Sequence, residues 1–258
     1  MAENPVIINS VTRALDILIY IYSRNGDVAV TEISRDLGIY KSTVFRMLAT
    51  LKAKKFVTQN AETEKYSLGP ELFIIGSSMN NQSELVKFIK PYSERLNKEM
   101  NEAVNVSVLS VMSNGEYQSV IIHKEESYHG LNANMEIGSR NDCYCSAVGK
   151  CLIAFSDDIN LEIYKGRMKK FTDNTITTFA ALKKEIEKVR EQGYAVDNEE
   201  REKGLFCLAV PVIINGTTEA ALSISGPETR MREDLDEKIE FITKLRDEIK
   251  NNTTRRNI

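Results

Sequence analysis

Residues 30–55, VTEISRDLGIYKSTVFRMLATLKAKK, contain two short helical patterns separated by a glycine. Thr31 is the expected N-cap of the first helix, because its hydroxyl oxygen can accept a hydrogen bond from a free backbone N–H. Gly38 supplies the backbone freedom that ends a helix in a tight turn. The second helix repeats apolar residues at helical spacing on one face, namely Val44, Leu48 and Leu51.

The other face of the second helix is basic and rich in hydroxyl groups. From Lys41 to Lys55 there are five Lys or Arg residues and no Asp or Glu, whereas a merely solvated face usually mixes both signs. The pattern is typical of a helix-turn-helix, whose second helix enters the major groove of DNA. An ordinary helix pair with a solvated basic face is the alternative. The polar residues on this face are Lys41, Ser42, Thr43, Arg46 and Thr50.

A short hairpin is predicted directly after the helix pair. Residues 56–59 and 65–68 have strand-like composition and flank a polar tip at 60–64. A hairpin in this place makes the domain a winged helix, in which Lys65 and the tip can contact phosphates or the minor groove. A hairpin that only covers the core is equally compatible with these residues.

Length and composition indicate a globular chain of about two domains. Of 258 residues, 42% are hydrophobic and 28% charged, and no run of about 18 apolar residues suggests a membrane span. The first residues lack a secretory signal pattern, so we expect a cytoplasmic protein. The net charge of −3 divides unevenly, with nine Lys or Arg against eight Asp or Glu in residues 1–80. A local basic helix can therefore bind phosphates beside an acidic partner domain.

The polar run at residues 80–83 separates the predicted domains, residues 1–80 and 81–258. Before it, Pro70–Met79 reads as an apolar connecting helix suited to a dimer contact or to packing on the next domain. The second domain mixes strands with flanking helices and predicts an α+β sensor-like fold. Its expected strands are 104–112, 117–124, 130–137, 205–214 and 219–225, and its expected helices are 83–100, 146–155, 178–192 and 232–252.

Several stretches in a fixed order resemble the IclR family of bacterial transcriptional regulators. They are SVTRALDIL at 10–18, KSTVFRML at 41–48, YSLG at 66–69, CSAVGK at 145–150, VREQGY at 189–194, DNEE at 197–200, GLFCLAVPV at 204–212 and ALSISGP at 221–227. The resemblance covers residues 9–250. It implies an α+β chain with an N-terminal winged helix-turn-helix domain, a linker helix and a C-terminal GAF-like α+β effector-binding domain.

The resemblance also implies a transcriptional regulator, more often a repressor, that binds double-stranded operator DNA as a homodimer or a dimer-of-dimers tetramer. Phosphate contacts set the register of such a protein on DNA, and an arginine can read a guanine edge. Tyr40 and Phe45 depart from the family, which often has proline and histidine there. The predicted DNA-binding residues are Thr31, Lys41, Ser42, Thr43, Phe45, Arg46 and Lys65.

The resemblance implies that a small carboxylic acid binds the second domain near the start of the helix that carries Gly149-Lys150. Free N–H groups at a helix N-terminus favour a carboxylate. Each expected ligand-binding residue can also have a purely structural role. The serines can lie at the edge of the core, and the cysteine can act as a small buried hydrophobe. The predicted effector-binding residues are Ala147, Val148, Asp197, Leu205, Cys207, Ser223 and Ser225.

Two other functions compete for the second domain. The cysteines with His123 or His129 can in principle form a metal or redox site, although Cys-x-Cys is not the usual zinc spacing. An enzyme is the second rival, but the sequence has no nucleophile elbow, phosphate-binding loop or dinucleotide fingerprint. We therefore expect no catalytic residues, metal or cofactor. The four cysteines are Cys143, Cys145, Cys151 and Cys207.

Overall fold

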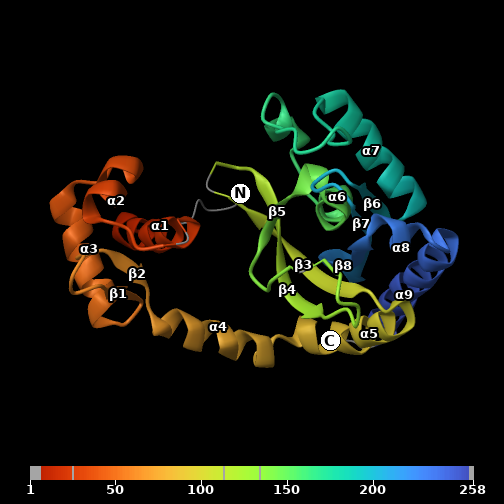
Figure 1. Ribbon diagram of the computed structural model, residues 1–258, viewed down its shortest axis with the longest axis horizontal. Helices are drawn as coiled ribbons and strands as arrows, with labels where there is room; N and C mark the ends of the chain where they lie inside the picture. Colours follow the sequence, from red (N-terminus) through yellow and green to blue (C-terminus); the bar gives the residue numbers. More distant parts are fainter. Residues whose placement is uncertain (1–6, 25, 113, 134, 256–258) are drawn as a thin grey trace. The chain divides into compact units, whose positions relative to one another are not determined.

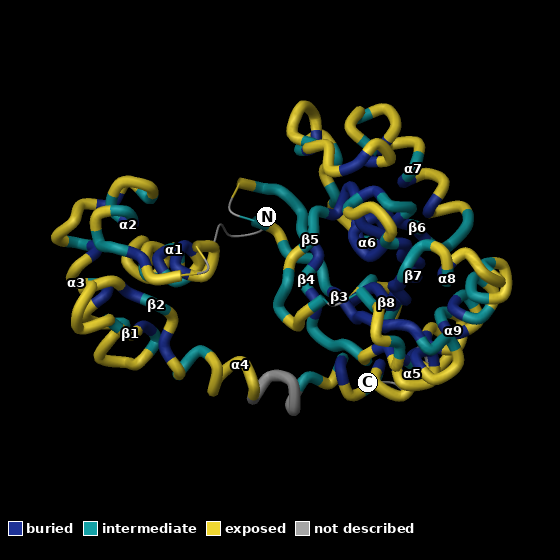
Figure 2. Tube along the Cα trace, viewed as in Figure 1, coloured by how far each residue is buried: buried dark blue, intermediate teal, exposed yellow. Residues whose placement is uncertain are grey.

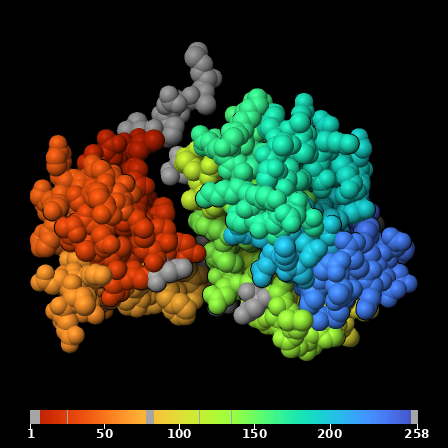
Figure 3. Space-filling model, turned by 45° about the horizontal axis from the view of Figure 1, so that its top comes forward, coloured from red at the N-terminus to blue at the C-terminus, as the bar shows by residue number. Residues whose placement is uncertain are grey.

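The computed structural model describes residues 7–24, 26–112, 114–133 and 135–255. The chain packs into two compact units, residues 1–82 and 83–258. In the space-filling view each unit has a continuous side-chain surface, red to orange for the first and yellow to blue for the second (Figure 3).

The first unit is a winged helix, as the sequence predicts. Three helices pack around a small core and the strands β1 and β2 pair antiparallel behind them (Figure 1). Val44 and Leu48, which are fully buried, hold the second helix of the predicted pair against this core. The elements are α1 Asn9–Ser23, α2 Val30–Leu37, α3 Lys41–Ala53, β1 Val57–Gln59, β2 Tyr66–Leu68 and α4 Pro70–Gln82.

The turn between α2 and α3 forms at Gly38, in the left-handed conformation with φ of 66°. The predicted cap at Thr31 is wrong, because α2 begins two residues earlier than expected and Ala29 is its N-cap. The Ala29 N–H donates to the Glu32 carboxylate over 2.7 Å, so a side chain inside the first turn takes over the capping role.

The second unit is built on a six-stranded antiparallel sheet with strand order β5-β4-β3-β8-β7-β6. Helices α6 and α7 cover one face and α5 and α9 the other (Figure 1). The α+β fold predicted from the sequence is confirmed. The elements are α5 Glu84–Met100, β3 Ala103–Val111, β4 Tyr117–Glu125, β5 Arg140–Asp142, α6 Ala147–Phe155, α7 Phe179–Gln192, β6 Ala195–Asn198, β7 Leu205–Ile214, β8 Thr217–Pro227, α8 Glu228–Arg232 and α9 Leu235–Arg255, with 3-10 turns at Cys143–Cys145 and Leu161–Tyr164.

The strand expected at residues 130–137 is wrong. The described residues of that segment form no strand, and the chain rejoins the sheet at Gly138, whose N–H donates to Ile121 O over 2.7 Å. The sheet edge is instead the three-residue strand β5, and β6 forms the opposite edge. Both edge strands are too short to show a clear alternation in sequence.

Helix α6 is buried along almost its whole length, from Ala147 to Ala154 (Figure 2). Gly149 allows this close approach, because a Cβ atom there would lie 2.3 Å from the Cα of Cys143. The N-terminus of α6 is therefore fixed against the turn that precedes it and points at the sheet face described below.

Candidate functional site

Helix α3 exposes the side chains that the sequence assigns to DNA. Lys41, Ser42 and Arg46 are exposed, and Thr43 is half-buried. Phe45 is 59% exposed, so its ring does not pack into the core. Within the described part of the chain, Lys41 and Arg46 have no carboxylate partner, which leaves both cations available to phosphates.

An open groove of about 760 Å³ runs between α1 and α3. Arg13 of α1 lines it together with Arg46 of α3. Sequence reasoning missed Arg13, because the stretch 10–18 points to the family but assigns no role to its single arginine. The polar residues lining the groove are Asn9, Ser10, Arg13, Thr43, Arg46 and Thr50.

The remaining predicted DNA contacts lie outside this groove. Thr31 is exposed in the first turn of α2, and Lys65 is exposed just before β2. The wing that carries Lys65 is tied to α3 by a 2.8 Å hydrogen bond from Lys52 Nζ to Gln59 Oε1. Their DNA contacts stay predictions.

The second unit contains a small cavity between the sheet and the start of α6, with a volume of about 20 Å³. Six of the seven predicted effector residues line it, whereas Leu205 lines a separate surface groove. Leu205 precedes Cys207 by two residues and packs partly against the same core. The six residues are Ala147, Val148, Asp197, Cys207, Ser223 and Ser225.

The sheet register explains why residues distant in sequence meet at this cavity. Cys207 pairs with Asp197 on one side and with Ser225 on the other. Asn105 pairs with Ser223 across β3 and β8. Because side chains in register point to the same face, these polar groups form a continuous patch under α6.

The N-terminus of α6 closes this patch. Ser146 is the N-cap, and its Oγ accepts a hydrogen bond from Gly149 N over 3.3 Å. The first amides of a helix have no intrahelical acceptor, so those of Ala147 and Val148 are suited to an anion.

Sequence reasoning missed half of the cavity wall. Asn105 and Ser107 lie in β3, whose sequence predicts a strand but no site, and Arg201 directly follows the DNEE stretch that contains Asp197. The signal in β3 was two polar residues with i, i+2 spacing in an apolar strand. The additional lining residues are Asn105, Ser107, Ile121, Met135, Asn141, Ser146 and Arg201.

Asp197 is the acidic group of the cavity. Burial raises its pKa to about 7, and the neighbouring Glu200 carboxylate contributes in the same direction. Its Oδ1 accepts a hydrogen bond from Glu200 N over 2.8 Å. Near pH 7 this side chain therefore exchanges between a neutral and an anionic form.

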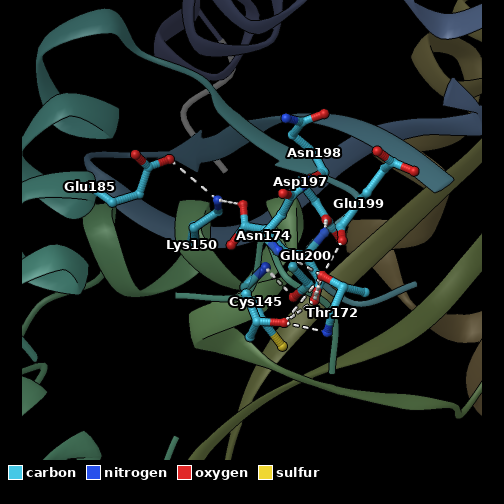
Figure 4. Close-up of polar contacts among 12 residues, drawn as sticks. Cys145, Lys150, Thr172, Asn174, Glu185, Asp197, Asn198, Glu199 and Glu200 are labelled. Carbon is cyan, nitrogen blue, oxygen red and sulfur yellow. Dashed lines mark hydrogen bonds and ion pairs between the residues drawn. The ribbon is translucent and has the colours of Figure 1, made fainter. Parts of the chain in front are cut away.

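A buried ion pair lies beside Asp197 (Figure 4). Lys150 is fully buried and pairs with Glu200 and with Glu185, whose Oε1 lies 3.3 Å from Nζ. Burial opposes the Lys150 charge, but the two carboxylates outweigh it and raise the pKa. The Gly-Lys pair in the stretch 145–150 thus has a structural role, since the lysine compensates buried acids.

The four cysteines are buried and reduced. Burial raises the pKa of Cys145 and of Cys151 to about 12, and raises the pKa of Cys143 and Cys207 as well. A buried thiol with a raised pKa is a poor nucleophile and a poor metal ligand. Among the residues that the structure describes, no three His, Cys, Asp or Glu side chains are grouped as a metal site would require.

Comparison with known proteins identifies the chain. The IclR helix-turn-helix domain model matches residues 10–61, and the bacterial transcriptional regulator IclR C-terminal model matches residues 78–251. The HTH-type transcriptional regulator KdgR of Escherichia coli (strain K12) is 37% identical over 235 residues, which cover 90% of this chain and 87% of the relative. The transcriptional repressor IclR of the same organism is 30% identical over 230 residues, covering 88% and 83%. The crystal structure of the Thermotoga maritima IclR aligns with a TM-score of 0.65 and 30% identity, covering 95% of this chain and 98% of that one.

An exposed basic helix beside a wing, followed by a separate α+β unit, defines a winged-helix transcriptional regulator. Within that class, the chain belongs to the IclR family of bacterial transcriptional regulators, as the ordered stretches predict. In the described part of the chain, no helix is long and apolar enough to cross a membrane.

Lys150→Met is expected to lower the free energy of unfolding by about 3–5 kcal/mol, because it leaves the buried Glu200 charge uncompensated. Urea denaturation measures the change. The double variant Lys150→Met/Glu200→Met is expected to recover most of the loss. The matched control is Lys244→Met, which breaks an exposed pair with Glu240 and should cost less than about 1 kcal/mol. Equal losses in the two single variants would contradict a structural role for the buried charge.

Proposed function

We propose that this protein is a repressor whose affinity for operator DNA is set by a small organic acid bound in the second unit. The observation that carries the proposal is the polar patch under the N-terminus of α6, which offers free amides, serine hydroxyls and a protonatable carboxyl group in one cavity. Relatives named as repressors support the direction of control.

On DNA, α3 enters the major groove. Lys41, Ser42 and Thr43 at its start contact phosphates, and Arg46 and Phe45 face the bases, Arg46 toward guanine and Phe45 toward a thymine methyl group. Arg13 in the groove beside α3 adds a phosphate contact that holds α1 on the backbone. Thr31 and Lys65 extend the phosphate contacts to α2 and the wing.

In the cavity, the amides of Ala147 and Val148 and the hydroxyls of Ser223 and Ser225 bind the carboxylate. A volume of about 20 Å³ holds about one water molecule, so an acid must displace parts of the cavity wall as it binds. Binding then favours one arrangement of the second unit over another. Through α4, this change of arrangement alters how two recognition helices meet DNA. The resulting change in DNA-binding free energy cannot exceed the difference between the acid's binding free energies for the two arrangements.

The active form is a homodimer or a tetramer formed from two dimers. Val11, Leu15 and Ile19 repeat at i, i+4 and i+8 on α1, and each is more than half exposed. Phe73 of α4 is 78% exposed in the same unit. Apolar stripes of this kind on a soluble domain mark contact surfaces, and operators with two half-sites require two copies.

We further propose that the protein is cytoplasmic and is not an enzyme. The four cysteine thiols are buried, and Glu185 and Glu200 are paired with Lys150, so these groups are poorly placed to act on a substrate. The raised pKa of Cys145 likewise disfavours the alternative of a metal-sensing or redox-sensing regulator.

Arg46→Ala and Ser223→Ala are expected to separate the two activities. Arg46→Ala should weaken binding to a DNA fragment selected by the wild-type protein by tenfold or more and leave acid binding intact. Ser223→Ala should weaken acid binding and leave DNA affinity without acid unchanged. Fluorescence anisotropy measures the first and calorimetry the second, with an acid found by a thermal-shift screen of keto, hydroxy and aromatic acids. If each variant loses both activities, the two-site proposal fails.

Acid affinity is expected to fall as the pH rises above about 7. Asp197 is neutral below the pKa of about 7 and anionic above it, and an anion beside the bound carboxylate repels it. Above about pH 7 the association constant of the acid should fall by a factor that approaches tenfold per pH unit. Asp197→Asn keeps the acceptor for Glu200 N but cannot ionise, so its affinity should be flat between about pH 6 and 8.5. Parallel pH profiles of the two proteins would contradict this role.

Leu15→Asp is expected to halve the sedimenting mass at a fixed protein concentration, because a carboxylate in the α1 stripe opposes its burial. Asn9→Asp, which adds the same charge to the same helix outside the stripe, is the control and should leave the mass unchanged. An unchanged mass for Leu15→Asp would show that the copies meet elsewhere.

A further inference from the structure

We infer that the cavity selects an aliphatic acid with oxygen atoms along its chain, which Ser107, Asn141 and Arg201 bind away from the carboxylate. This inference rests on the proposed effector site and adds the chemical class of the ligand. The shared chemistry is a flexible chain rich in hydrogen-bond acceptors, supplied either by a second carboxylate or by several hydroxyl groups.

Ser107 gives the first independent observation. Its side chain is fully buried at the cavity, and its Oγ has no hydrogen-bond partner among the described residues. The register explains this isolation, because Ser107 pairs with Ile121 on one side and with Ala221 on the other. Neither neighbour has a polar side-chain atom. Buried hydroxyl groups are nearly always partnered, so this one points to an atom supplied by a ligand.

Arg201 gives the second observation. It lines the same cavity, and its guanidinium packs over the Phe171 ring with 4.0 Å between Cζ and the ring centroid. The guanidinium has no carboxylate partner in the described part of the chain. Stacking on a ring holds the planar group but uses none of its five N–H donors. The donors are therefore available to oxygen atoms of a ligand.

The remaining wall adds further hydrogen-bond donors beside the apolar residues Ile121, Met135 and Val148. Among the described residues, the one hydrogen-bond acceptor within reach of Asn141 Nδ2 is the weak acceptor Met135 Sδ, at 4.0 Å. Asn105 Nδ2 donates to Ser225 Oγ at the long distance of 3.5 Å. An aromatic or alkyl chain would bury these groups without partners, and a site built from hydrogen-bonding groups rejects ligands that lack theirs.

Four acids of similar size test the inference by titration calorimetry on the full-length protein: adipate, gluconate, hexanoate and benzoate. Adipate or gluconate should bind at least tenfold more tightly than hexanoate and benzoate. Tighter binding of adipate identifies a second carboxylate as the partner of Arg201, and tighter binding of gluconate identifies hydroxyl groups. Equal or tighter binding of hexanoate or benzoate overturns the inference and leaves the proposed effector site intact. If none of the four binds, the inference fails, and the screen of keto, hydroxy and aromatic acids tests the effector site separately.

Ser107→Ala and Arg201→Gln test the named residues. Ser107→Ala should weaken binding of the preferred acid about tenfold and leave the affinity for hexanoate unchanged. The urea midpoint should stay the same or rise, because an unpaired buried hydroxyl is lost. Arg201→Gln should lower the affinity for adipate more than the affinity for gluconate. Arg167→Gln removes an exposed arginine paired with Glu116 and is the control. A loss for hexanoate as large as that for the preferred acid would show a general packing defect and overturn the assignment.

Discussion

The register of the β7–β8 hairpin is the constraint on which the second unit depends. Its tight turn places Asn215 and Gly216 in positive φ, at 50° and 87°, which suits a two-residue connection and fixes the pairing. Cys207 and Ser225 then face α6, while Phe206 and Ile224 face α5 and α9. A slip of one residue would exchange these faces, placing polar atoms in the core under α5 and α9 and removing the cavity.

Buried charge gives the same region a second constraint. Lys150 reaches from α6 to Glu200, just beyond β6, and to Glu185 of α7 (Figure 4). One cation thus ties two helices to the edge of the sheet, and the neighbouring Asp197 remains neutral up to about pH 7 because burial and Glu200 disfavour its charge. The network holds the cavity wall near Asp197 and leaves that group available to respond to an added anion.

The sequence predicts those parts of the molecule whose signal is local. Helix α3, the wing and the β7–β8 hairpin each have a period, a turn residue or a charge run within a few positions, and the resemblance located six cavity residues. Prediction from the sequence fails where an element or a site depends on strands that pair from distant parts of the chain. Strand β6 is four residues long, and the exposure of Ser107 to the cavity depends on neighbours more than a hundred residues away in β8. The N-cap predicted at Thr31 is wrong for a local reason, since the Glu32 side chain takes the capping role by accepting from Ala29 N.

The proposed control of DNA binding requires two arrangements of the second unit with different affinities for the acid. The small cavity supplies a physical basis for such a difference. In the arrangement described, about 20 Å³ is too little for a carboxylic acid of several atoms, so binding to this form is opposed by close-packed walls. An arrangement in which Met135 and Arg201 move outward would admit the acid and pair Ser107. Because walls of packed side chains shift between discrete arrangements, selective binding to the open form can supply the 1–3 kcal/mol of coupling typical of linked sites.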